Sequence, residues 1–143
     1  MPNNPACTQI SLRLRRLARN INRGRPYVRF IEAGSLVRNI DPMQKPDQAA
    51  EAYRLLGDVH MRFRDPRQAY LAYRQGLRLT LPGTAQWAHL EACRLQARLR
   101  LGVKVQLNKL EATTTALSKN RPRKRGDREA LRRAQTLLAR MKG

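Results

Sequence analysis

The chain has 143 residues and a formal net charge of +20, from 30 Lys and Arg against 10 Asp and Glu. This length predicts one compact domain or a short repeat array, because two separate cores would each bury too little surface. No run approaches the roughly 18 consecutive apolar residues that cross a bilayer, and Cys7 and Cys93 are too few for a disulfide framework. These features argue against membrane-spanning and disulfide-rich classes and predict a soluble protein of a reducing intracellular compartment, such as the cytoplasm.

Positive charge is concentrated at the two ends of the chain. Residues 1–40 hold 8 basic and 1 acidic residue, and residues 118–143 hold 10 and 2, whereas the segments between them are closer to balance. Because like charges repel, two cationic ends predict an anionic partner. Arginine makes up 24 of the 30 cations, and its planar guanidinium suits phosphate; GC-rich coding bias is the alternative explanation.

The first predicted helix covers residues 9–21. Because no acidic residue precedes Glu32, an organellar targeting helix is an alternative interpretation of this region. Arginines occupy one arc of the helix, and the opposite face is apolar. That face is formed by Ile10, Leu14, Leu17, Ala18 and Ile21.

A second helix is expected to begin at Pro26, a residue that favours the first helical turn. Gly34 and Ser35 are expected to end or break it. Two prolines within residues 41–46 then predict a connection. We therefore place the end of an N-terminal helical segment at residue 46, so that it covers residues 1–46.

Three helical stretches with clear start and stop signals follow. Asp65 is a typical N-cap, and Pro66 suits the first turn after it. Thr84 is an N-cap of the same kind, and Gly102 is a typical helix end. The predicted helices cover residues 47–63, 66–80 and 85–101.

The C-terminal part predicts one more helix, a basic linker and a final helix. Residues 118–126 contain five cations and no apolar residue, so they are predicted to form the linker. Asp127 is expected to cap the final helix, over residues 127–143. Before the linker, a 4,3,4,3 spacing indicates a helix packed along a seam through Val103, Leu107, Leu110, Thr114 and Leu117. The final helix has an apolar face of Ala130, Leu131, Ala134, Leu137, Leu138 and Met141.

The middle of the chain, residues 47–117, resembles a tetratricopeptide repeat, a helix-turn-helix unit of about 34 residues. The matching residues are Tyr53, Leu56, Gly57 and His60 in the first helix and Ala69, Tyr73 and Gly76 in the second. Small residues at three of these positions permit close helix contact, and Tyr73 is expected to fill the gap that they leave.

A second, degenerate copy of the repeat begins at Trp87 and Leu90. In it, Val103, Leu107 and Leu110 repeat the spacing of the first copy's second helix. The resemblance implies a scaffold that docks a protein partner, without indicating which one. Two units leave apolar faces open, so other helices or a partner must cover them. The expected fold is therefore all-α: a short repeat array with N-terminal amphipathic helices and a C-terminal capping helix.

Residues 17–34 resemble, more weakly, a repressor-type helix-turn-helix, whose second helix enters the DNA major groove. Asn22 and Pro26 depart from that pattern at the turn and at the start of the recognition helix. Two capping helices of a repeat domain are the alternative interpretation.

The sequence offers no constellation for catalysis. His60 and His89 have no Cys, His or carboxylate at metal-ligand spacing, and Asp47 and Glu51 are placed to support a helix dipole. No glycine-rich phosphate-binding loop is present. We therefore expect no enzyme activity, no metal site and no cofactor.

Two basic clusters remain as candidate binding residues, because cations of this kind contact phosphates without sequence choice. Tyr27 and Phe30 lie among them and are candidates for stacking on an unpaired base, with burial in the core as the alternative. The N-terminal cluster is Arg13, Arg15, Arg16, Arg19, Arg23, Arg25 and Arg29. The C-terminal cluster is Arg121, Arg123, Lys124, Arg125, Arg128, Arg132 and Arg133.

The sequence thus predicts a non-enzymatic, basic helical-repeat protein that binds nucleic acid and docks a protein partner. RNA, in a ribonucleoprotein, is favoured over DNA. Two alternatives stay open: an adaptor or chaperone for an acidic protein partner, and a helix-turn-helix DNA-binding regulator. For residues 119–125, a solvated tail or a nuclear-import-like signal is the alternative to nucleic-acid contact.

Overall fold

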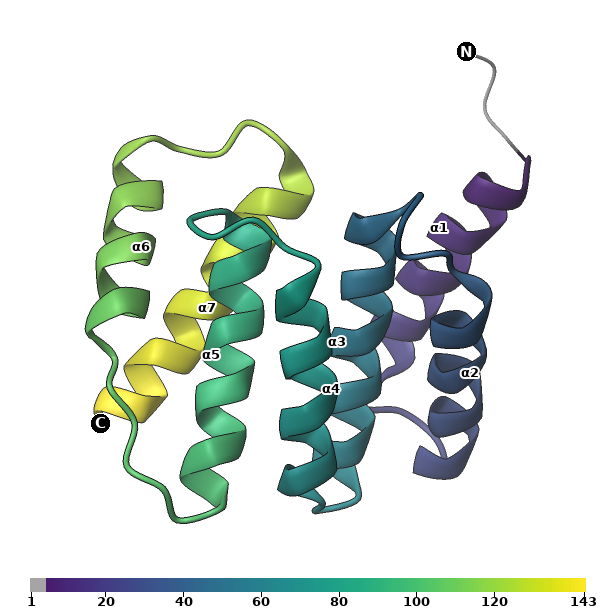
Figure 1. Ribbon diagram of the computed structural model, residues 1–143, viewed down its shortest axis with the longest axis horizontal. Helices are drawn as coiled ribbons and strands as arrows, with labels where there is room; N and C mark the ends of the chain where they lie inside the picture. The colour runs from purple at the N-terminus through teal and green to yellow at the C-terminus, as the bar shows by residue number, and fades with distance from the viewer. Residues whose placement is uncertain (1–4) are drawn as a thin grey trace.

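The computed structural model describes the backbone of residues 5–143 and the side chains from residue 9 onward, so the side chain of Cys7 lies outside the described part. Over residues 5–143 the chain forms seven helices and no strand, which confirms the all-α fold class. Figure 1 shows the helices side by side as successive hairpins. They are α1 (Pro5–Asn20), α2 (Pro26–Asn39), α3 (Pro46–Arg62), α4 (Pro66–Arg78), α5 (Ala85–Arg100), α6 (Asn108–Lys119) and α7 (Arg125–Lys142).

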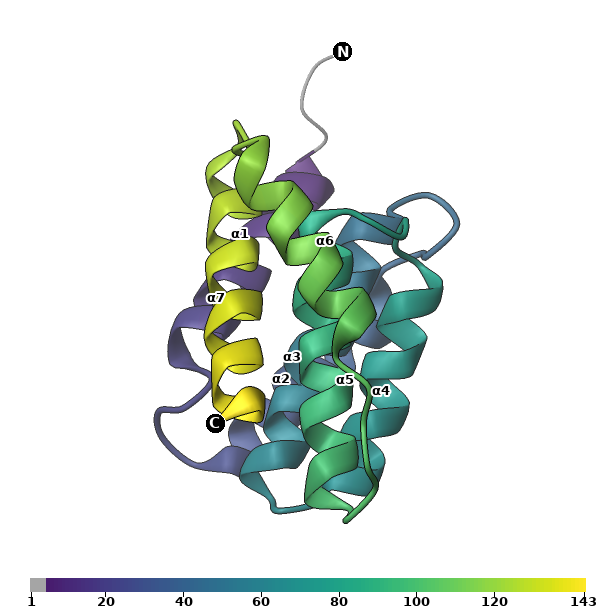
Figure 2. The same ribbon diagram turned by 90° about the vertical axis from the view of Figure 1, so that its left-hand side faces the viewer.

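The described helices form a linear array in which each contacts only helices one or two places away in chain order. Three apolar clusters follow one another along it. The first joins α1, α2 and α3 around Leu36 and Leu55, and the second joins α3, α4 and α5 around Tyr73 and Leu90. The third joins α5, α6 and α7 around Leu110, where α6 and α7 cover the end of the array (Figure 2). Successive cores that share a helix are typical of a helical repeat array.

Four residues that were predicted to begin or end helices do so in the structure. Pro26 is the first residue of α2. Its lack of a backbone N–H costs nothing there, because the first N–H groups of a helix have no acceptor within the helix. Asp65 and Thr84 each accept a hydrogen bond from the backbone N–H three residues on, at 3.2 Å, and so cap α4 and α5. Gly102 follows Leu101, the C-cap of α5, and adopts a left-handed φ of 80°, a conformation that favours glycine.

Close packing of α3 on α4 depends on the small residues of the first predicted repeat. A Cβ atom on Gly57 would lie only 2.4 Å from Cε1 of Tyr73, so the ring occupies the space that a side chain would fill. Ala69 and Gly76 are buried in α4, and Gly76 lies against Leu90 of α5. The remaining repeat residues are Tyr53, Leu56 and His60, half-buried in α3, and Trp87, buried in α5.

Several predicted helix boundaries are wrong. The first helix begins at Pro5 and not at residue 9, and the linker is shorter than residues 118–126 because α6 continues to Lys119 and α7 begins at Arg125. Gly34 and Ser35 do not interrupt α2, which continues to Asn39 because Ala33 and Leu36 on either side of them are buried against α1 and α3. A core face that spans both positions outweighs the low helix propensity of glycine. Asp127 does not cap the final helix either. α7 already begins at Arg125, and Asp127 lies in its first turn, where its charge favours the helix dipole.

The predicted helix beginning at Val103 is also wrong. The N–H of Val103 donates to the carbonyl of Arg98 at 3.1 Å, a bond that closes the C-terminus of α5. The chain then stays non-helical as far as Leu107, and α6 begins at Asn108. Val103 and Leu107 therefore do not occupy the positions that a second repeat copy requires, although Leu110 is buried as expected.

Candidate functional site

The N-terminal cluster lies on α1, on the turn that follows it and on the start of α2. Six of its seven arginines are exposed, and Arg29 is half-buried. Arg29 forms an ion pair with Glu32 at 3.0 Å and donates to the carbonyl of Arg23 at 3.2 Å. The other six, Arg13, Arg15, Arg16, Arg19, Arg23 and Arg25, form no ion pair with a described residue.

The C-terminal cluster occupies the connection between α6 and α7 and the first half of α7. All seven of its cations are exposed. Arg132 and Arg133 share the carboxylate of Glu129, at 2.6 and 3.1 Å, and Arg128 donates to the carbonyl of Arg123 at 3.1 Å. The other members, Arg121, Lys124 and Arg125, form no ion pair with a described residue.

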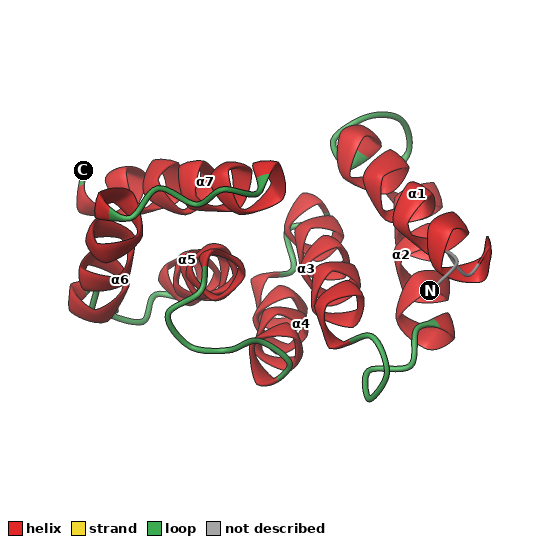
Figure 3. Cartoon of the chain, turned by 90° about the horizontal axis from the view of Figure 1, so that it is seen from above, coloured by secondary structure: helices red, strands yellow, loops and turns green. Residues whose placement is uncertain are grey.

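The tertiary structure brings some members of each cluster to the lining of one groove. A cavity of about 550 Å³ is lined by residues of α1, α3, α5 and α7 and of the connection that precedes α7. In Figure 3, α1 and α7 lie on opposite sides of the view, above α3 and α5. Arg15 reaches the cavity from one side, and Lys124 and Arg133 reach it from the other. A second cavity, of about 370 Å³, continues it along α7 and shares Arg54, His89 and Arg133 with it. We call the two cavities together the groove.

The groove is nearly neutral in an otherwise strongly cationic protein. Its lining includes half of the chain's acidic residues but only a fifth of its basic ones, which gives a net charge of +1. The remaining surface therefore carries +19. The acids are Asp47, Glu51, Asp58, Asp127 and Glu129, and the bases are Arg15, Arg54, Lys124, Arg132, Arg133 and Arg140.

A buried arginine, Arg54, forms the floor of the groove and is only 5% exposed. Its guanidinium pairs with Glu51 at 2.5 Å and with Asp58 at 2.8 Å, both on α3. Burial opposes its charge, but these two carboxylates outweigh that effect and raise the pKa of Arg54. The hydroxyl of Tyr73 donates to the other oxygen of Asp58 at 2.5 Å.

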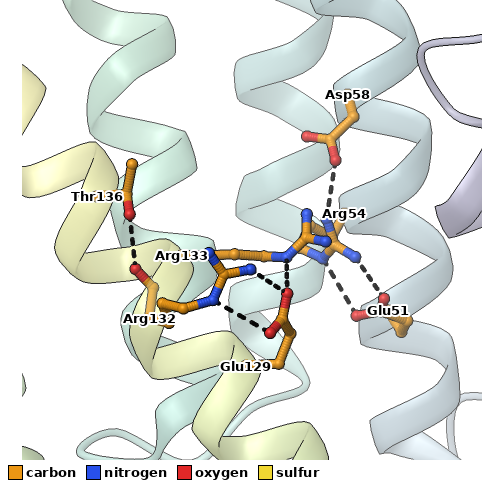
Figure 4. A network of polar contacts seen from close by, with 7 residues as sticks. All are labelled: Glu51, Arg54, Asp58, Glu129, Arg132, Arg133 and Thr136. Atoms are coloured by element: carbon orange, nitrogen blue, oxygen red, sulfur yellow. Dashed lines mark hydrogen bonds and ion pairs between the residues drawn. The ribbon is translucent and has the colours of Figure 1, made fainter.

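Arg133 extends from α7 toward this network (Figure 4). Burial opposes the charge of Glu51, yet the nearby Arg54 and Arg133 guanidinium groups lower the pKa of that carboxyl. Sequence reasoning assigned Glu51 to helix-dipole support and did not single out Arg54 or Asp58. The signal was present in the i,i+3 and i,i+4 spacing of opposite charges on one helix.

Burial at the groove floor is unfavourable for two polar groups, the charged form of the His89 imidazole and the Oε1 atom of Gln48. His89 is buried and lines both cavities, and its pKa is well below the ordinary value because of burial and the nearby Arg54 and Arg133 charges. The Oε1 atom of Gln48 is buried and accepts no hydrogen bond from a described residue. Such an acceptor carries an unfavourable desolvation energy until a donor reaches it.

Tyr27 and Phe30 are not in the core. Their side chains are 64% and 37% exposed, so the alternative interpretation of these two residues, burial, is wrong. Both lie near the start of α2, next to the N-terminal cluster.

The described residues lack other features that would define a site. No three His, Cys, Asp or Glu side chains among them lie close enough together to hold a metal ion. None of their helices combines the length and the apolar character that crossing a bilayer requires. No protein-family model matches the sequence, and comparison with curated proteins and with solved structures gives no significant match.

Proposed function

We propose that this chain is a non-enzymatic helical-repeat protein that binds nucleic acid, RNA in preference to DNA, through its outer cationic surface. One observation carries the proposal: the surface outside the groove has a net charge of +19, and nine of the ten cluster cations that lie there are exposed. Exposed arginines without carboxylate partners are free to bind phosphates and to displace the counterions around them. This field attracts a polyanion and gives affinity without sequence preference.

The salt dependence of binding tests the proposal. We expect the logarithm of the association constant for a fluorescently labelled RNA to fall linearly with the logarithm of salt concentration over about 50–200 mM, with a slope of about −0.7 for each single-strand phosphate contacted. The same oligonucleotide as DNA tests the preference for RNA. An affinity that does not change with salt would refute phosphate contact.

A charge-matched pair of variants locates the surface. Replacing Arg13, Arg16 and Arg19 of α1, which are exposed outside the groove, with Gln should reduce the salt slope by about two units, because those contacts would be lost. Replacing Arg67, Arg74 and Arg78 of α4 with Gln removes the same charge from another exposed face. If the two triple variants weaken binding equally, only the net charge matters and the N-terminal cluster is not an interface.

The groove favours a second function, the docking of a polypeptide. Its charge balance gives little attraction for a polyanion, and its lining combines apolar side chains such as Leu14 and Ala130 with the polar groups of Gln48 and Gln86. We expect peptides selected from a random library to lose binding when Ala130, which lines the first cavity, is replaced with Trp. RNA affinity should be unchanged in that variant. Peptides that bind it as well as the wild type would place docking elsewhere.

A further inference from the structure

Three of the chain's seven Phe, Tyr and Trp residues are exposed, and they lie together. Tyr27 and Phe30 of α2 have ring centroids 6.5 Å apart, and Phe30 is 6.2 Å from Phe63, which follows α3. Phe30 also packs edge-on against His60 at 5.6 Å. Both phenylalanines of the chain belong to this group, at 37% and 44% exposure. We call these four residues the aromatic patch.

Ile31 enlarges the apolar surface, because it is exposed on α2 one turn after Tyr27 and directly after Phe30. A soluble protein rarely gathers exposed aromatic residues in this way unless the surface binds something. The apolar clusters of the fold do not include Phe30 or Phe63. The patch is therefore available to a ligand.

Arginines surround the patch because two turns meet there. The guanidinium of Arg62 donates to the carbonyls of Ile21 and Gly24, at 2.9 and 3.0 Å, and so ties the α1–α2 turn to the end of α3. Both turns lie at the lower end of the molecule in Figure 1. The exposed Arg23 and Arg25 lie on either side of Gly24 and precede Tyr27 along the first turn.

The second turn contributes Arg64, which is exposed and directly follows Phe63. Its φ of 57° is in the left-handed region that favours glycine. Asp65, the nearest acid in sequence, is engaged as the N-cap of α4. Glu32 on α2 is paired with Arg29. The carboxylates near the patch are thus occupied, and its exposed charges are positive.

We propose that the aromatic patch stacks on unpaired bases of a single-stranded nucleic acid whose phosphates contact Arg23, Arg25 and Arg64. Exposed aromatic rings stack on bases of any sequence, and neighbouring cations follow the backbone. In a duplex the bases are already stacked on one another, so their faces are not available to the patch. This inference rests on the proposed function, and it specifies a single-stranded substrate for it.

Charge complementarity favours this occupant over a protein. A protein that covers the patch would have to bring its own carboxylates to the three flanking arginines, whereas every nucleotide of a single strand supplies both a base and a phosphate. Binding by a protein instead is one of the outcomes that the experiment distinguishes.

The test measures binding of the full-length chain to three labelled probes by fluorescence anisotropy, with all variants compared at one salt concentration and the wild type measured over the range of about 50–200 mM as well. The probes are a short uridine oligonucleotide, an abasic oligonucleotide with the same backbone, and an RNA duplex with the same number of phosphates. The variants are Tyr27→Ala and Phe63→Ala, and the control is Leu81→Ala, which removes another exposed apolar side chain, 75% exposed, from outside the patch. Far-UV circular dichroism verifies that each variant is folded.

We expect Tyr27→Ala and Phe63→Ala each to weaken binding of the uridine strand by about 5- to 100-fold. Binding of the abasic strand and of the duplex should change by less than about twofold, and Leu81→Ala should bind all three probes like the wild type. Tyr27→Trp should preserve or tighten binding of the uridine strand, because stacking needs a ring and no hydroxyl.

Three results would overturn the inference. Equal loss for the uridine and abasic strands would mean that the patch acts on the backbone. Unchanged RNA binding together with loss of a co-purifying protein in Tyr27→Ala would assign the patch to that protein. Wild-type binding that is salt-dependent but insensitive to all patch variants would refute stacking while leaving the proposed function intact. Absence of salt-dependent binding to every probe would instead refute the proposed function itself.

Discussion

Replacing Gly57 with alanine tests the contact on which the α3–α4 hairpin depends. The new methyl group would lie 2.4, 2.6 and 2.8 Å from three ring carbons of Tyr73, whereas ordinary contact begins near 3.4 Å. The ring must therefore move by about 1 Å. It is buried, and its hydroxyl is held by Asp58, so the movement would disturb both the core and the groove floor.

The expected destabilisation follows from two opposing effects. Overpacking a well-filled site raises the free energy of the folded state by about 1–3 kcal/mol. Because the Tyr73 ring is buried and its hydroxyl is bonded to Asp58, we expect the overpacking cost of Gly57→Ala to be near the upper end, about 3 kcal/mol. Alanine favours the helix over glycine by about 1 kcal/mol. The net loss in the free energy of unfolding is about 2 kcal/mol, which urea denaturation followed by circular dichroism at 222 nm resolves readily.

Two further variants make this prediction specific. Gly126→Ala in α7 meets nothing within 4 Å, so it should leave stability unchanged or raise it by up to about 1 kcal/mol. In a Tyr73→Leu background, Gly57→Ala should be much less destabilising, because the ring is gone. If Gly57→Ala is as stable as Gly126→Ala, the ring does not fill the space at Gly57 and the packing argument fails.

Two other predictions concern the groove floor. Arg54→Leu leaves Glu51 and Asp58 without their cation and should lower the free energy of unfolding at pH 7 by about 2–3 kcal/mol, below the usual 3–5 for a buried pair because both carboxylates are partly exposed. The deficit should shrink toward pH 4, where the carboxylates take up protons; urea denaturation showing the same deficit at both values would contradict the ion network. His89 has a lowered pKa in the fold, so the unfolded chain binds the extra proton first and stability should fall as the pH drops below about 6.5, by at most about 1.4 kcal/mol per pH unit. His89→Asn should flatten this dependence more than His60→Asn, since His60 is less buried and its pKa is lowered less; an unchanged slope in His89→Asn would rule out a buried neutral imidazole.

The parts of the fold that sequence predicts correctly are those controlled by residues close together in the chain. Helices begin at Pro26 and after the N-caps Asp65 and Thr84. The first backbone N–H groups of a helix have no helical acceptor, and each of these residues either lacks such an N–H or accepts a hydrogen bond from one within the same turn. The Gly57–Tyr73 contact was predictable because a short turn connects α3 to α4 and leaves little choice of how they meet. The predicted break at Gly34 was wrong because local propensity was outweighed by burial against α1 and α3.

Local sequence thus determined that the chain is helical, where most helices begin, and that its charge is strongly positive. Only the packing of distant helices decided where that charge is balanced. The acids of the groove come from α3 and α7, which three other helices separate in the sequence, and the patch joins Phe30 of α2 to Phe63 beyond α3. Periodicity shows which residues share a helix face, but the neighbouring helices determine whether that face is covered, lines a groove or stays exposed.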